Sequence, residues 1–221
     1  MNENLSFESY FGTPVYAVEL PELVKNLNKI SNKFILEAKK NNEELIKNRQ
    51  KNFKKKIGDF GLSHHSKSLI NESGFKDIRS YVEERSFEIL DHIGYDLTDY
   101  KLKWSEMWVQ EFAKKGGGHH TLHTHWNGHI SGFYFLKASE RTSMPIFEDP
   151  RAGNVMNLLP EKDKTKITTA SSQIHFKVKP GRMIFFPSYM PHLYSVDMGY
   201  EPFRFIHWNC QAIPKGVLNV V

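Results

Sequence analysis

Histidine is concentrated in one short stretch of the sequence. Five of the eleven histidines lie within residues 119–129. Two of them, His123 and His125, form a His-x-His step shortly before the strand-like run from Ile130 to Leu136. Because alternate residues of a strand point to the same side, both imidazoles are predicted to reach one point inside a barrel. Imidazole nitrogens bind divalent transition metals, so the step predicts part of a metal site.

A third ligand is expected from a distant part of the chain. His192 follows the apolar run Phe185-Phe186-Pro187, where a strand is predicted to end at the mouth of the barrel. Together with His123 and His125 it would hold one side of an ion and leave the other side open, as oxygen-activating Fe(II) requires. Any single histidine is more often a hydrogen-bonded surface or core residue, so the ordered set carries the prediction. Three neighbours are left outside the site, with roles open between contact with a metal ligand or the substrate and plain exposure: His119, His120 and His129.

Arg204, in the apolar run from Phe203 to Cys210, is a further candidate site residue. Alternation places Arg204 on the same face as Ile206 and Trp208, and this face is predicted to look into the barrel. A buried guanidinium costs free energy unless it meets an anion. A dicarboxylate held by a bidentate pair is one such anion. A salt bridge to a carboxylate side chain at the barrel edge is the alternative.

The first hundred residues are predicted to form a strand and two helices. A turn at Gly12 and Pro14 leads into a short strand, and Pro21 begins an amphipathic helix whose apolar residues recur three and four apart. Residues 41–62 have few apolar anchors and two glycines, which indicates a mobile connection. A second amphipathic helix is predicted over residues 75–93, closed by Gly94.

Beyond residue 100 the sequence changes to short aromatic and β-branched runs. The predicted strands are Leu102–Phe112, Ile130–Leu136, Pro145–Phe147, Ile174–Val178, Arg182–Phe186 and Phe203–Cys210. Pro180-Gly181 is predicted to be a hairpin-type turn between two of them. The long polar insertion from Arg151 to Ser172 is a candidate lid. The fold class is therefore mainly β, a sandwich or barrel with helices packed outside it.

Several of these motifs together carry a resemblance. They are His123-Thr-His125-Trp-Asn127-Gly-His-Ile-Ser131, Phe147-Glu-Asp149-Pro-Arg151, Pro187-Ser-Tyr-Met-Pro-His192 and the downstream Arg204. In order and spacing the chain resembles the 2-oxoglutarate- and Fe(II)-dependent oxygenase superfamily, and within it a prolyl-hydroxylase-like group with a His-x-His motif. The resemblance implies a double-stranded β-helix, or jelly roll. It also implies Fe(II) on His123, His125 and His192, 2-oxoglutarate on Arg204, and hydroxylation of an unidentified substrate with release of succinate and CO₂.

The resemblance has two departures. Most of the superfamily has Asp or Glu where this chain has His125, so three neutral ligands would lower the negative charge around the iron. An oxygen ligand from Asn127, Glu148, Asp149 or water is the alternative. Many relatives also carry Ser and Tyr where this chain has Ile206 and Phe135, and Ser131 is predicted to be the substitute hydroxyl for the cosubstrate. Asp149 and Arg151 are expected either to orient substrate or to pair with each other.

Composition sets the remaining expectations. The 221 residues are expected to form one domain, with a strand and helical front (1–99) and a jelly-roll core (100–213). One cysteine, Cys210, and no signal or membrane-spanning segment favour a cytoplasmic protein. The net charge of +5 is concentrated in residues 25–56 and indicates a solvated helix face, so nucleic acid is not an expected partner. A small-molecule or peptidyl substrate is expected, and a homodimer stays open.

Two other functions remain compatible with the sequence. A three-histidine cupin-type dioxygenase that does not use 2-oxoglutarate would suit a site without a carboxylate. A catalytically silent jelly-roll binding module would retain no metal. Dependence on 2-oxoglutarate separates the first of these from the oxygenase, and metal retention separates the second.

Overall fold

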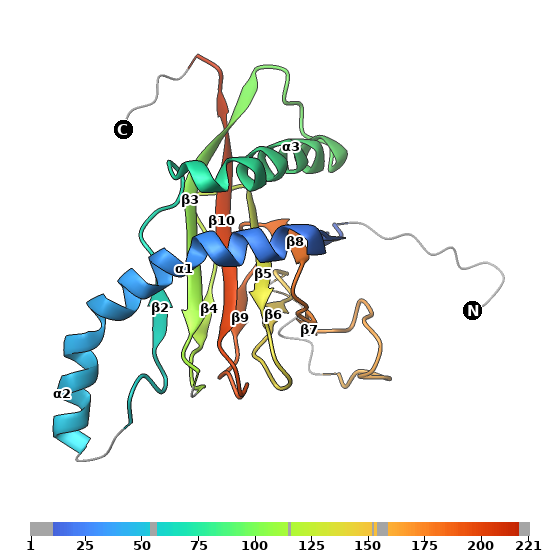
Figure 1. The fold of residues 1–221 in the computed structure, drawn as a ribbon. Helices are drawn as coiled ribbons and strands as arrows, with labels where there is room; N and C mark the ends of the chain where they lie inside the picture. The colour runs from blue at the N-terminus through green and yellow to red at the C-terminus, as the bar shows by residue number, and fades with distance from the viewer. Residues whose placement is uncertain (1–10, 54–56, 115, 152, 154–158, 217–221) are drawn as a thin grey trace.

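The protein is built around two antiparallel β-sheets (Figure 1). A computed structural model describes residues 11–53, 57–114, 116–151, 153 and 159–216. The larger sheet has the strand order β1 (Tyr16–Glu19), β8 (Arg182–Pro187), β5 (Ile130–Lys137), β10 (Phe203–Pro214), β3 (Tyr100–Phe112) and β2 (Ser63–His65). The smaller sheet has the order β4 (His120–His123), β9 (His192–Tyr194), β6 (Pro145–Glu148) and β7 (Gln173–His175). The expected mainly-β architecture is confirmed.

Two helices cover the outer face of the larger sheet, as Figure 1 shows. A 3₁₀ turn at Pro21–Leu23 leads into α1 (Val24–Asn41), and a 3₁₀ turn at Ser73–Phe75 leads into α3 (Lys76–His92). Both helices turn an apolar stripe toward the sheet, and both were predicted from the spacing of that stripe. Gly94 follows α3 with φ +103°, a conformation that favours glycine and ends the helix there.

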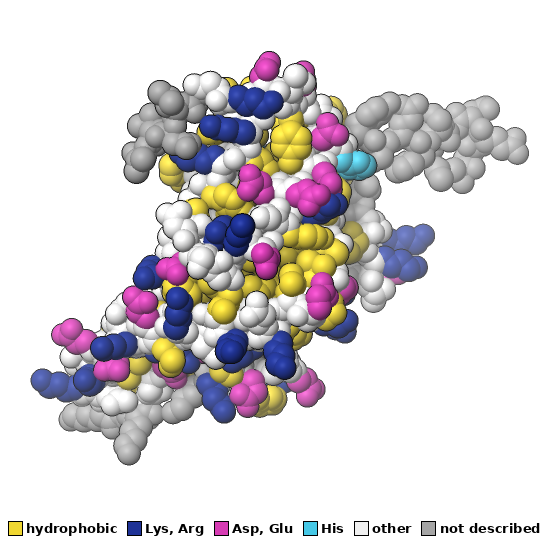
Figure 2. All heavy atoms as spheres, turned by 45° about the horizontal axis from the view of Figure 1, so that its top comes forward, with side chains coloured by type: hydrophobic (Ala, Val, Ile, Leu, Met, Phe, Trp, Pro, Cys, Tyr) yellow, Lys and Arg dark blue, Asp and Glu magenta, His cyan; other side chains and the backbone are white. Residues whose placement is uncertain are grey.

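The connection predicted for residues 41–62 contains a third helix, α2 (Glu43–Phe53), so that prediction was wrong in part. The sequence of α2 is rich in Glu, Lys, Arg, Gln and Leu, which are good helix formers. Acidic Glu43 and Glu44 lie in its first turn and Lys51 in its last turn, where each favours the helix dipole. The spacing of apolar residues did not reveal it because its three apolar residues, Leu45, Ile46 and Phe53, do not recur three and four residues apart. Lys, Arg, Asp and Glu are interspersed along this part of the surface (Figure 2).

The turn at Pro180-Gly181 does not join a hairpin. The strand before it, β7, pairs with β6 in the smaller sheet, and the strand after it, β8, pairs with β1 and β5 in the larger one. The backbone of Gly181 donates to Phe135 O at 2.8 Å and accepts from Leu20 N at 2.7 Å. These bonds hold the turn against the larger sheet, so the chain passes here from one sheet to the other.

Strand β10 separates two hydrophobic cores. On one face Ile206, Trp208 and Cys210 pack against the sheet neighbours that α1 and α3 cover. On the other face Phe203 and Phe205 belong to an aromatic cluster between the two sheets. We call the space between the two sheets the interior. Because both faces of β10 are buried, its alternate residues reach two different environments.

None of the helices among the described residues is long and apolar enough to cross a membrane.

Candidate metal site

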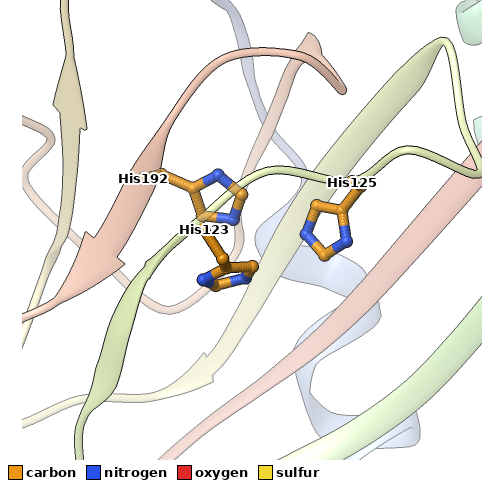
Figure 3. A group of neighbouring side chains, drawn as sticks. All are labelled: His123, His125 and His192. Carbon is orange, nitrogen blue, oxygen red and sulfur yellow. The ribbon is translucent and has the colours of Figure 1, made fainter.

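The three predicted ligands converge at one end of the interior (Figure 3). The ring centroids of His123 and His192 lie 4.4 Å apart, and those of His125 lie 5.0 Å from His123 and 5.1 Å from His192. One nitrogen from each ring lies within 4.8 Å of one nitrogen from each of the others. This spacing is close to what three ligands of a single ion require after small side-chain movements.

Two short strands of the smaller sheet place His123 and His192 opposite each other. His123 ends β4 and His192 begins β9, and the two residues are partners in the ladder. The Nδ1 atom of His123 lies 2.7 Å from Thr121 O, and that of His192 lies 3.0 Å from Met190 O. A carbonyl only accepts, so each Nδ1 carries the proton and donates it. Each Nε2 is then left with a free lone pair, as a metal ligand requires.

His125 reaches the same point from beyond the strand. The sequence placed it beside His123 on one strand, but β4 ends at His123, and His125 lies in the following loop. Its backbone N–H donates to Ser188 O at 2.9 Å, which fixes the loop against the end of β8. Its Nδ1 lies 3.1 Å from Asn209 Nδ2. The backbone bond to Ser188 and the contact with Asn209 therefore direct the ring of His125 toward His123, which strand alternation was expected to do.

The rings of His125 and His192 are neutral and incompletely paired. Burial, followed by the nearby His123, lowers the pKa of His125 to about 4 against the opposing charge of Glu106. Burial lowers the pKa of His192 to about 3 despite its bond to Met190 O. The Nε2 atoms of His125 and His192 are buried without a hydrogen-bond partner. Buried polar atoms are nearly always paired, so these two indicate a missing ligand. The free Nε2 of His192 fits a divalent metal ion. Nδ1 of His125 faces the donor Nδ2 of Asn209, so the proton of this ring lies on Nε2, and His125 would bind the ion after a change of tautomer.

A buried polar network holds the site from behind. Ser131 Oγ donates to Asn209 Oδ1 at 2.6 Å and lies 2.8 Å from Ser188 Oγ. Asn209 Nδ2 in turn donates to Glu106 Oε2 at 2.7 Å. Ser131 therefore lies in the interior and is linked to His125 through Asn209; its contact with the cosubstrate stays a prediction. The sequence analysis did not find Asn209 or Glu106, although Asn209 alternates with Phe205 and His207 along β10 and Glu106 is its ladder partner on β3.

Arg204 lies on the opposite face of β10 from the histidines. Its Nη2 and Nε atoms lie 2.6 and 2.8 Å from Glu111 Oε2, and its Nη1 donates to Asn32 Oδ1 at 2.7 Å and contacts Asn28. Arg204 does share a face with Ile206 and Trp208, but this face looks toward α1. Of the two roles left open for Arg204, the salt bridge with a carboxylate is the arrangement found. Among the described residues Arg204 is the only buried Lys or Arg.

The two carboxylates proposed as alternative ligands belong to no group of clustered ligand atoms in the described part of the chain. Glu148 accepts from Gln173 Nε2 at 2.9 Å, and Asp149 pairs with Arg151 at 2.5 Å. Asn127 is within 3.4 Å of Asn209 Nδ2. The expected pairing of Asp149 with Arg151 is present on the surface, and these two residues line a groove together with Thr168, Ser171 and Ser172 of the insertion.

Comparison with known proteins places this site in a family context. Residues 106–202 match the family model described as "Putative 2OG-Fe(II) oxygenase". This segment contains all three histidines, and the resemblance seen in the sequence is confirmed. No curated protein matches the chain.

Solved structures show the same fold. A prolyl-4-hydroxylase from Pseudomonas putida has a TM-score of 0.52 at 8% identity, over 89% of this chain and 92% of that one. The α-ketoglutarate-dependent epimerase SnoN from nogalamycin biosynthesis has a TM-score of 0.50 at 12% identity, over 93% and 80%. An oxidoreductase of the 2OG-Fe(II) oxygenase family from Burkholderia pseudomallei has a TM-score of 0.45 at 10% identity. That match covers 64% of this chain and only 60% of the longer protein. The double-stranded β-helix predicted from the sequence is confirmed.

The described residues include a fitting set of ligands for one expected cofactor, Fe(II), but not the expected anchor for the other, 2-oxoglutarate. Fe(II) and 2-oxoglutarate both appear in the description of the matched oxygenase family. The three histidines form a set that could bind iron. The anchor expected for 2-oxoglutarate does not fit in the same way, because the guanidinium of Arg204 is bound to Glu111, away from the interior.

Proposed function

We propose that the protein is an Fe(II)-dependent oxygenase that hydroxylates a small molecule or a peptidyl side chain, with 2-oxoglutarate as cosubstrate. The observation that carries the proposal is the convergence of His123, His125 and His192, with two buried Nε2 atoms that have no hydrogen-bond partner. A bound Fe(II) would supply the activation of dioxygen, which no side chain supplies by itself. The match of residues 106–202 to an oxygenase family supports this assignment over other uses of a three-histidine site.

The protein residues orient and protect this centre. The carbonyls of Thr121 and Met190 fix the rings of His123 and His192, so that Nε2 points toward the ion. The aromatic rings of Phe133, Phe147 and Phe186 lie 5.8, 6.0 and 4.9 Å from the ring of His192. These rings keep water away from one side of the site. An apolar surrounding of this kind strengthens every electrostatic interaction within it.

The groove at the edge of the smaller sheet is the proposed path for the substrate. Two of its lining residues, Phe147 and Met190, also contact His192. Its other walls carry Glu148, Asp149 and Arg151, so a polar or charged substrate is favoured. Ser131 remains the hydroxyl that we predict to act on the cosubstrate. With Arg204 on the other face, no buried Lys or Arg of the described residues would meet it in the interior.

Anaerobic titration of the Fe(II)-loaded protein with 2-oxoglutarate tests the proposal. We expect a visible metal-to-ligand charge-transfer band that is absent from His192→Gln. The matched control is His120→Gln, which removes another partly buried histidine of β4 that belongs to no ligand set, and it should keep the band. Iron that stays bound while no band forms would reject the use of 2-oxoglutarate. A wild-type protein that binds no iron would reject the metal site and favour a silent binding module.

One observation favours a second candidate. The only buried Lys or Arg in the described part of the chain faces α1, so the interior lacks a buried cation for a dicarboxylate. A three-histidine dioxygenase that needs no 2-oxoglutarate would fit such an interior. Oxygen consumption by the Fe(II)-loaded protein with candidate thiols or diketones, in the absence of 2-oxoglutarate, distinguishes this candidate.

A further inference from the structure

A second group of metal-ligand atoms lies beside the three-histidine site. It consists of Glu106, His125 and His207, whose ligand atoms lie within 4.8 Å of one another. We propose that this group is an alternative seat for the same divalent ion, and that it provides the carboxylate that the His-x-His step lacks. The inference rests on the proposed function only in that both need a bound metal.

His207 is the strongest evidence for the second seat. It lies in the middle of β10, its side chain points into the interior, and only 1% of its surface is exposed. Neither of its ring nitrogens has a hydrogen-bond partner. Its ring stacks on that of His125 at 4.8 Å and packs between Trp108 at 4.6 Å and Phe133 at 5.1 Å. An imidazole without any partner is rare in such a place, and a metal ion would satisfy it.

Glu106 already points toward this position. Its Oε1 accepts from Trp108 Nε1 at 2.7 Å, and its Oε2 accepts from Asn209 Nδ2 at 2.7 Å. Two donors therefore fix the carboxylate close to His125, which contacts the same amide of Asn209. Two histidines and one carboxylate with open positions are the usual ligands of non-haem Fe(II) in oxygenases. The set with His123 and His192 has only neutral ligands.

The two seats exclude each other. Both use His125, and the two sets together contain one carboxylate to offset the charge of a metal ion. Two dications held by neighbouring groups that share His125 would repel each other even at an effective dielectric constant of about 20. One ion per chain is therefore expected, distributed between the seat with His192 and the seat with His207.

Titration with Co(II), measured by equilibrium dialysis, tests this redundancy. The wild type should bind one Co(II) per chain. His192→Gln should bind it more weakly but still measurably, because the second seat remains. Adding His207→Gln or Glu106→Gln to His192→Gln should weaken binding at least a further tenfold. The matched control is His192→Gln combined with His120→Gln, which should bind Co(II) as His192→Gln does.

The outcomes separate the inference from the proposed function. If His192→Gln alone abolishes binding, or if the Glu106 and His207 changes add nothing to it, the second seat is rejected while the three-histidine site stands. If Glu106→Gln or His207→Gln abolishes binding in a protein that keeps His192, and His192→Gln alone does not, the second seat stands and the three-histidine site is rejected. Two ions per wild-type chain would overturn mutual exclusion. Circular dichroism of each metal-free variant checks its folding. If His192→Gln with His207→Gln fails to fold, His192→Gln with Glu106→Gln is measured in its place.

Discussion

Arg204 and Glu111 are ladder partners on β10 and β3 and form a buried ion pair, with Nη2 of Arg204 2.6 Å from Oε2 of Glu111. Both side chains are almost fully buried, and Lys39 of α1 adds a bond to Oε1 at 2.6 Å. Burial by itself raises the pKa of Glu111, but the charges and hydrogen bonds of Arg204 and Lys39 outweigh it and hold the pKa below its usual value. The pair therefore fastens α1 to the sheet.

Replacing the arginine should destabilise the protein without affecting the metal. In Arg204→Met the carboxylate of Glu111 stays buried without its main partner, which typically costs about 3–5 kcal/mol in the free energy of unfolding. Urea unfolding of the metal-free protein measures this loss. Lys166→Met, which breaks the exposed pair with Asp163, is the control and should cost about 0.2–1 kcal/mol. The opposite result would be an Arg204→Met variant that has wild-type stability but binds 2-oxoglutarate more weakly. It would show that Arg204 binds the cosubstrate.

Removing the amide behind His125 should weaken metal binding. Asn209→Ala takes away the group that contacts both His125 Nδ1 and Glu106 Oε2. Groups that orient metal ligands typically contribute about 10–100-fold to affinity, so Co(II) should bind Asn209→Ala more weakly by a factor in this range. Equilibrium dialysis gives the dissociation constant. Ser131→Ala, which removes only the hydroxyl on the far side of Asn209, should change it less. Equal affinities in both variants and the wild type would show that the network does not position the ligands.

Metal binding should stabilise the folded protein. An ion that binds only the folded chain adds about 2.7 kcal/mol when its free concentration is about 100 times the dissociation constant. A thermal melt in Co(II) should therefore shift upward, and a chelator should reverse the shift. The shift should be smaller in His192→Gln and unchanged in His120→Gln. A melting temperature that does not respond to Co(II) would contradict a resident metal site.

Periodicity predicted the long elements and some of the short strands, but not β2, β4 and β9. Helices α1 and α3 and the strands around Tyr134 and Phe205 carry long apolar patterns, which local sequence determines. Strands β2, β4 and β9 contain three or four residues each and exist because partner strands bind them, as β9 binds β4. Such pairing depends on contacts between distant residues, which the sequence order alone does not reveal.

The candidate site shows the same division. The three histidines were recognisable because their spacing is distinctive, whereas Glu106 and His207 come from two separate strands and have no motif of their own. Alternation correctly grouped Arg204 with Trp208, but it could not say which side of β10 faces the histidines, because both sides are buried. Because β10 lies between two hydrophobic cores, its sequence has no polar face that would show which way each side chain points.

The stability of the metal-free protein should depend on pH through its buried histidines. The folded pKa of His192 is about 3, because burial outweighs the bond to Met190 O and nearby histidines add to the shift. In the unfolded chain it would be about 6.5. Between these values only the unfolded chain takes up the proton. The stabilisation is therefore complete above about pH 6.5 and is lost as the pH falls toward 3, by about 1.4 kcal/mol per pH unit for each such histidine.

Urea unfolding at pH 7, 6 and 5 in the presence of a chelator measures this dependence. His192→Gln removes one titrating group, so the free energy of unfolding should fall less steeply with decreasing pH than in the wild type. His125, whose pKa of about 4 is also lowered mainly by burial, should give a similar effect in His125→Gln. Ser131→Ala titrates nothing and should keep the wild-type slope. Identical slopes in all four proteins would show that the pKa values of these rings do not differ between the folded and unfolded states, so that burial does not hold them neutral.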